Sequence, residues 1–147
     1  QILEAGAHIV VGHHPHVVQG YDLVQVKGAQ KLAMYSLGNF ISGMTWRLGP
    51  DEMQGMIAAT GESYMLSVDV RCDAGGCSVM QPEPIPIANY MNERSQMVVA
   101  RMSDLTDGSV KLSAAWRAYY AQRLELMRAS LARSAPANGS GRSVSAP

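Results

Sequence analysis

The sequence predicts an α/β fold, and three observations support that prediction. Residues 9–11 form a wholly apolar run that ends at Gly12, as is typical of a short strand buried on both faces. Residues 21–26 alternate between apolar and polar side chains, which predicts a strand with one buried face. Between residues 112 and 131 large apolar side chains recur every three or four positions, which predicts an amphipathic helix.

The other elements follow in chain order. Residues 1–7 are predicted to be the end of a helix, with Gly6 as its C-cap. Residues 32–35 predict a further strand, and residues 42–62 an irregular excursion rich in glycine, methionine and polar groups. Residues 95–105 place apolar side chains at helical spacing and predict another helix.

A hairpin is predicted between residues 64 and 81, with its turn at residues 73–76. Cys72 and Cys77 flank this turn and face each other across it. Two interpretations stay open, because the cysteines are either free thiols or form a disulfide, which demands a particular geometry. A disulfide would place the protein outside the cytosol.

The composition excludes some classes of protein. With 47% hydrophobic and only 16% charged residues among 147, the chain lacks the composition of a disordered protein. Lys+Arg and Asp+Glu both number 12, so there is no basic excess of the kind that nucleic-acid binders carry. Arg117, Arg123 and Arg128 are expected on the solvated face of the predicted helix. No apolar run approaches the roughly 18–20 residues that span a bilayer.

Three of the four histidines stand together in Gly12-His13-His14-Pro15-His16, directly after the predicted buried strand. Pro15 keeps His14 out of the helical region, so the loop is expected to be extended. Side chains two positions apart then project to the same side, so His14 and His16 converge on one site, while His13 points to a second ligand position or a hydrogen-bond partner. Because imidazole is a good ligand for Zn, Mn or Fe, the cluster predicts metal ligation or direct catalysis.

A second cluster, Tyr35-Ser36-Leu37-Gly38-Asn39-Phe40, follows the next predicted strand. Asn39 offers both an amide donor and a carbonyl acceptor. Two interpretations stay open. In one, Ser36 or Asn39 binds substrate or orients a ligand histidine by a hydrogen bond. In the other, the segment is only a polar turn at the end of a strand. His8 precedes its strand and is interpreted as a structural histidine.

Taken together, the segments from Ala5 to Gly20 and from Tyr35 to Phe40 resemble the CapA family of bacterial capsule or poly-γ-glutamate synthesis proteins. The strong part of the resemblance covers roughly residues 1–42. It implies a C-terminal fragment of a four-layer α/β/β/α, metallophosphatase-like sandwich, with a β-hairpin and C-terminal helices. The implied CapA-like domain portion covers residues 1–110. The spacing of apolar side chains predicts an amphipathic helix over 111–132, and a composition of Ala, Ser, Gly and Pro predicts a disordered tail over 133–147.

The resemblance also implies a site for divalent metal ions (Mn, Zn or Fe), two of them in the full-length protein. The implied ligands are His13, His14 and His16, and the implied catalytic groups are His14 and His16; which pair ligates stays open. Such sites also need carboxylates. The family's acidic motifs lie upstream, and none of Asp22, Asp51 or Asp69 stands at a motif position. This chain alone is therefore expected to be inactive.

The function that the resemblance implies is capsule or poly-γ-glutamate biosynthesis, with a metal-dependent, phosphoesterase-type hydrolase site. Its partners would be the capsule polymer, or a phosphorylated or γ-glutamyl substrate, together with other capsule-synthesis proteins and no nucleic acid. The alternative is a non-catalytic scaffold of the cell envelope, or a polymer-export component, that keeps the fold. Both place the protein in the cell envelope or on the extracellular side of a bacterial membrane.

Overall fold

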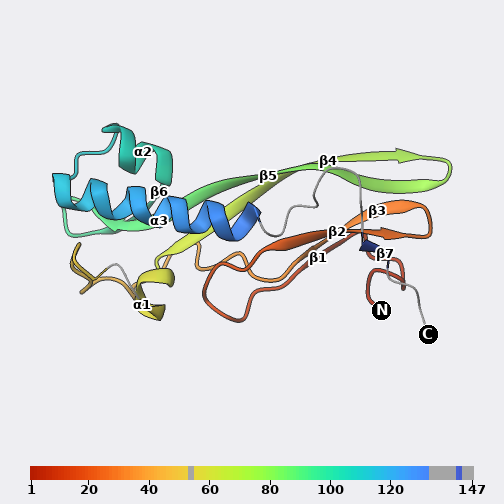
Figure 1. The fold of residues 1–147 in the computed structure, drawn as a ribbon, viewed down its shortest axis with the longest axis horizontal. Coiled ribbons are helices and arrows are strands. Elements are labelled where there is room, and N and C mark those ends of the chain that lie inside the picture. The colour runs from red at the N-terminus through yellow and green to blue at the C-terminus, as the bar shows by residue number, and fades with distance from the viewer. Residues whose placement is uncertain (53–54, 133–141, 144–147) are drawn as a thin grey trace.

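The computed structural model describes residues 1–52, 55–132 and 142–143, which form two small sheets and three helices (Figure 1). In chain order the elements are β1 (Ile9–Val11), β2 (Tyr21–Val26), β3 (Ala29–Met34), α1 (Met56–Ala59), β4 (Glu62–Asp73), β5 (Gly76–Met91), β6 (Met97–Arg101), α2 (Met102–Asp107), α3 (Ala114–Ala132) and β7 (Arg142–Ser143). One sheet has the strand order β1-β3-β2-β7 and the other β4-β5-β6. The long β4–β5 ribbon runs the length of the molecule (Figure 1). The predicted mixed α/β class is therefore confirmed.

The first sheet is built on a tight antiparallel hairpin. β2 and β3 pair from Tyr21 opposite Met34 to Val26 opposite Ala29. Lys27 and Gly28 connect them, both at positive φ (52° and 85°), as the common two-residue hairpin turns require. The alternation in β2 turns Tyr21 inward, and it is only 3% exposed. The strand predicted at residues 21–26 is confirmed.

β1 is a strand as predicted, but the prediction that it is buried on both faces is wrong. It pairs in parallel with β3 and occupies the edge of its sheet. Ile9 and Val11 are 37% and 54% exposed. An apolar run indicates an extended segment. Whether that segment is covered depends on packing partners, and the described residues cover these two side chains only in part.

Residues 2–6 form turns, so the prediction of a helix end there is wrong. Ala5 N donates to Gln1 O at 2.9 Å, which is one helix-like bond, but the next two backbone bonds lengthen to 3.4 Å. Gly6 has φ 125°, well outside the left-handed helical region of an ordinary C-cap glycine. A single turn is too short to hold a helix without further packing.

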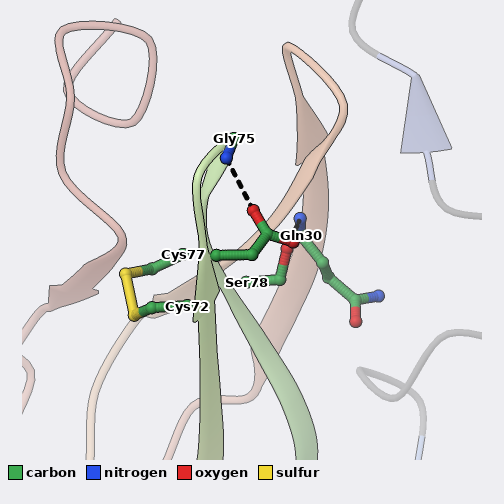
Figure 2. The surroundings of a disulfide bond; sticks show 6 residues. Gln30, Cys72, Gly75, Cys77 and Ser78 are labelled. Atoms are coloured by element: carbon green, nitrogen blue, oxygen red, sulfur yellow. Dashed lines mark hydrogen bonds between the residues drawn. A yellow bond between two sulfur atoms is a disulfide. The ribbon is translucent and has the colours of Figure 1, made fainter.

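The second sheet contains the predicted cysteine-flanked hairpin. β4 and β5 pair down to Asp73 opposite Gly76, and a disulfide joins Cys72 to Cys77 across the last rungs, with their Cα atoms 4.0 Å apart. In the turn, Gly75 N donates to Asp73 Oδ1 at 2.7 Å. Figure 2 shows this tip lying beside the β2–β3 hairpin, where Gln30 N donates to Ser78 Oγ at 3.3 Å.

The prediction of a helix over residues 95–105 is wrong for its first half. Met97–Arg101 is strand β6, which pairs with residues 87–91 of β5, and α2 begins only at Met102. The β-branched pair Val98-Val99 fits a pleated strand better than a helix. α2 ends at Gly108, whose φ of 96° takes the chain out of the helix.

Helix α3 confirms the amphipathic helix predicted between residues 112 and 131. Its inner face and the two sheets share one apolar core, whose least exposed members are Leu32, Tyr64, Val79, Met102 and Leu105. One residue of α3 contradicts the sequence analysis. Arg123, expected in solvent, is 8% exposed and forms an ion pair with Glu62 of β4.

The C-terminal prediction lies largely outside the described residues. Of the tail expected over residues 133–147, the structure describes only Arg142–Ser143, which pair in parallel with β2. Among the described helices, none has the length and apolarity needed to cross a membrane.

Candidate functional site

The histidine loop begins where β1 ends and passes close to the end of β3. Gly12 N donates to Met34 O at 2.7 Å. A Cβ atom at this position would lie 2.4 Å from Tyr35 O, so only glycine lets the two segments approach in this way. The close approach sets residues 13–16 beside the segment from Ser36 to Asn39.

The contact that joins the two motifs is between His16 and Asn39. His16 Nδ1 lies 2.9 Å from Asn39 Oδ1. His16 is an exposed residue with φ 59°, a backbone conformation that histidine adopts more often than most residues. Asn39, by contrast, is buried at 9% exposure. The buried amide of Asn39 thus fixes the side chain of the exposed His16 through this hydrogen bond.

The orientation of Asn39 determines where the ring proton of His16 sits. Asn39 Nδ2 donates to Thr60 O at 2.9 Å, and only the NH2 group of the amide can make that bond. Asn39 Oδ1 therefore faces His16 and accepts, so Nδ1 of a neutral ring must carry the proton. The lone pair is then left on Nε2, which is free to bind a metal ion or to accept a proton.

The structure places His13 and His14 in the same exposed loop. The predicted convergence of His14 and His16 assumed an extended chain, in which side chains two positions apart project to the same side. The positive φ of His16 interrupts the extended path, so this rule does not apply there. Within the described ranges, the structure has no group of three or more His, Cys, Asp or Glu side chains arranged to hold a metal ion. His8 is exposed as well.

Ser36 and Gly38 shape the turn that carries Asn39. Ser36 is fully buried, and its Oγ accepts a bond from Gly38 N at 3.3 Å. Gly38 has φ 81°, and a Cβ there would lie 2.3 Å from Glu62 O. Asn39 N in turn donates to Glu62 O at 3.2 Å. In this structure Ser36 thus supports the position of Asn39 from inside the turn.

Asn89 is a supporting residue that the sequence analysis missed. It lies in β5 at 4% exposure, and its Nδ2 donates to Asn39 O at 3.3 Å and to Gly61 O at 3.1 Å. Its Oδ1 accepts from Ser42 N at 3.0 Å, and its backbone O accepts from Tyr120 Oη at 2.9 Å. The available signal was an asparagine, a residue disfavoured in strands, within the apolar stretch around Ile87.

Glu62, whose backbone O accepts the bond from Asn39 N, also forms a buried ion pair with Arg123. Arg123 Nη2 donates to Glu62 Oε2 at 2.9 Å, and Arg123 Nε donates to Oε1. Burial raises the pKa of the Glu62 carboxyl, and the hydrogen bond and charge of Arg123 oppose that shift. Both groups are buried and have lost their hydration. Each charge is therefore stabilised by the other.

The comparisons with known proteins single out the part of the chain that carries the His16–Asn39 contact. Residues 1–44 match the family model described as bacterial capsule synthesis protein PGA_cap. A 45-residue stretch is 47% identical to the capsule biosynthesis protein CapA of Bacillus anthracis. Over residues 1–44 the chain is therefore similar to the CapA family. The resemblance drawn from the two motifs is thereby confirmed.

The CapA match has a limited extent. It covers 31% of this chain and 10% of the length of the Bacillus anthracis protein. No solved structure matches the chain. The part that matches includes the histidine loop and Asn39, whereas Asn89, Glu62 and Arg123 lie beyond it.

Proposed function

We propose that this chain is part of a CapA-like protein of capsule or poly-γ-glutamate biosynthesis with a metal-dependent, phosphoesterase-type site. In this proposal the loop of His13, His14 and His16 supplies histidine ligands, and Asn39 orients His16. The similarity to the CapA family over residues 1–44 supports the biosynthetic role. The substrate class is the capsule polymer, or a phosphorylated or γ-glutamyl compound.

The His16–Asn39 hydrogen bond is the observation that carries the site proposal. Metal-binding histidines nearly always donate their second ring N–H to a fixed acceptor, which sets the tautomer and the direction of the ring. Asn39 Oδ1 is such an acceptor, since Thr60 O holds the amide in place. The Nε2 of His16 then has the donor chemistry of a ligand for Zn, Mn or Fe.

The remaining ligands in this proposal come from two sources. His13 and His14 offer exposed imidazoles in the same loop. The carboxylates are assigned to polypeptide outside this chain, since the described residues contain no group of three or more His, Cys, Asp or Glu side chains arranged to hold a metal ion. A bound divalent ion would act as a Lewis acid toward a phosphoryl or carbonyl oxygen. One loop histidine would hold the proton for a leaving group.

The finer architecture and the location belong to the same proposal. The two sheets would form part of a four-layer sandwich, in which additional chain covers the exposed side of β1. The Cys72–Cys77 disulfide supports a position in the cell envelope or outside the cell, because disulfides persist in oxidising compartments.

Metal analysis of purified protein that carries this chain tests the proposal. We expect bound Zn, Mn or Fe to be lost in the double variant His14→Ala/His16→Ala and retained in His8→Ala, which removes the histidine outside the loop. Circular dichroism spectra of the variants should match that of the parent, because all three side chains are exposed. Unchanged metal content in the double variant would refute the site proposal.

The alternative proposal is a non-catalytic envelope scaffold or polymer-export component. It predicts that the metal content of the double variant equals that of the parent, and that the function of the protein does not depend on metal. Substituting the histidine loop would then leave capsule or polymer production unchanged in a complementation assay.

A further inference from the structure

A small cavity lies between the loop of residues 45–48, strands β5 and β6, and helix α3. Its volume is about 110 Å³. Its wall contains five aromatic side chains and one charged one, and these are Trp46, Tyr90, Trp116, Tyr119, Tyr120 and Glu62.

The aromatic wall is a packed cluster on one face of α3. Trp116 meets Tyr119 edge to face at a centroid distance of 5.2 Å and stacks on Tyr120 at 5.9 Å. Burial raises the pKa of the Tyr119 hydroxyl to about 12, so the hydroxyl remains neutral and the surroundings are poorly hydrated. Electrostatic attractions in such surroundings are stronger than in water.

The aromatic rings around the cavity favour a cation as its occupant. Aromatic rings carry negative potential on their faces. Glu62 contributes the only charged side chain to the described lining, and the lining contains no Lys, Arg or His. Arg123 compensates Glu62 without lining the cavity. Trp46 already attracts a cation, since the Arg47 guanidinium carbon lies 4.3 Å from its ring centroid.

The size of the cavity limits the occupant to a small group. Apolar cavities of about 150 Å³ are known to hold benzene, which has six heavy atoms. Tetramethylammonium, with five heavy atoms, is of comparable size. We propose that this cavity binds a small organic cation of the alkylammonium class, with the aromatic wall around the methyl groups.

Tryptophan fluorescence of the intact chain gives a direct test, because the only two tryptophans of the sequence, Trp46 and Trp116, both line the cavity. Titration with tetramethylammonium and with choline should give a saturable change in emission. The neutral isostere of choline, 3,3-dimethylbutan-1-ol, should bind about tenfold more weakly, since a desolvated cation–π contact contributes to affinity. Sodium acetate should produce no saturable change.

Variants of the loop side chains locate the binding. Trp46 is 59% exposed, so Trp46→Leu should keep the fold while weakening choline binding about tenfold, and Trp46→Phe should keep most of it. Arg71→Ala is the matched control and should bind as the parent does, because Arg71 is exposed on β4 and does not line the cavity. Equal affinity for choline and its neutral isostere would overturn the proposal. So would the absence of binding in both fluorescence and saturation-transfer NMR.

Discussion

Residues 1–44 and residues 62–132 differ in what they contribute to this molecule. The first region carries the CapA match and exposes its three loop histidines, whereas the second has no such match and holds most of the least exposed core side chains, among them Val79, Met102 and Leu105. The comparison teaches that the family match covers the exposed histidine loop and not the bulk of the packing. The two regions meet at Asn39 and Asn89, so the site of the first depends on the scaffold of the second.

Removing Arg123 should have the largest effect on stability. Arg123→Met leaves the buried Glu62 carboxylate without its partner and should lower the free energy of unfolding by about 3–5 kcal/mol. Urea denaturation measures this change. The matched control is Arg128→Met, whose exposed pair with Glu125 should contribute less than about 1 kcal/mol.

A double variant sharpens that prediction. Glu62→Met combined with Arg123→Met removes both charges, so it should recover at least half of the stability that Arg123→Met loses. If the double variant is as unstable as the sum of the two single variants, the penalty does not arise from an unpaired buried charge.

Substituting Asn89 should have a smaller effect that reaches both regions. Asn89→Ala removes the side-chain bonds to Asn39 O, Gly61 O and Ser42 N and should cost about 1–3 kcal/mol of stability. It should also broaden or shift the NMR signals of His16. Gln25→Ala, an exposed amide on β2, is the control and should change neither. Unaltered His16 signals in Asn89→Ala would show that the two regions are not coupled through this residue.

Alkaline pH should gradually lower the free energy of unfolding, because of buried tyrosines in the second region. Burial raises the pKa of Tyr64 and of Tyr119 to about 12, above the value of about 10 in an unfolded chain. Between these values the unfolded state loses protons that the native state keeps, so the free energy of unfolding should decrease as pH rises from about 10 to 12. Tyr64→Phe should reduce this decrease without loss of stability at neutral pH, because Tyr64 Oη is buried with no partner among the described residues. Denaturation curves across this range measure both effects.

Local sequence patterns predicted the elements whose partners lie nearby. β2 and the β4–β5 hairpin follow from alternation and turn residues, and α3 follows from the spacing of its apolar side chains. Residues 97–101 were wrongly predicted to be helical because their apolar spacing fits both periods. Pairing with β5, which no local pattern contains, decides in favour of the strand.

The candidate site was predictable only in part. The proline-locked histidines and the adjacent asparagine indicated chemistry at residues 12–16 and 39, but the positive φ of His16 was not foreseeable from an extended-chain rule. Arg123 resembles any helix-surface arginine until Glu62, 61 positions away in sequence, is placed beside it. Long-range polar partners of this kind leave no periodic signal in the sequence.

The central claim is that Asn39 holds His16 with its proton on Nδ1 and leaves Nε2 free as a ligand. Long-range ¹H–¹⁵N correlation NMR of the chain, under alkaline conditions where imidazole is neutral, reads the protonated nitrogen directly. The account predicts a protonated Nδ1 in the parent chain and the loss of that preference in Asn39→Leu. A proton on Nε2 of His16 in the parent chain would contradict the account.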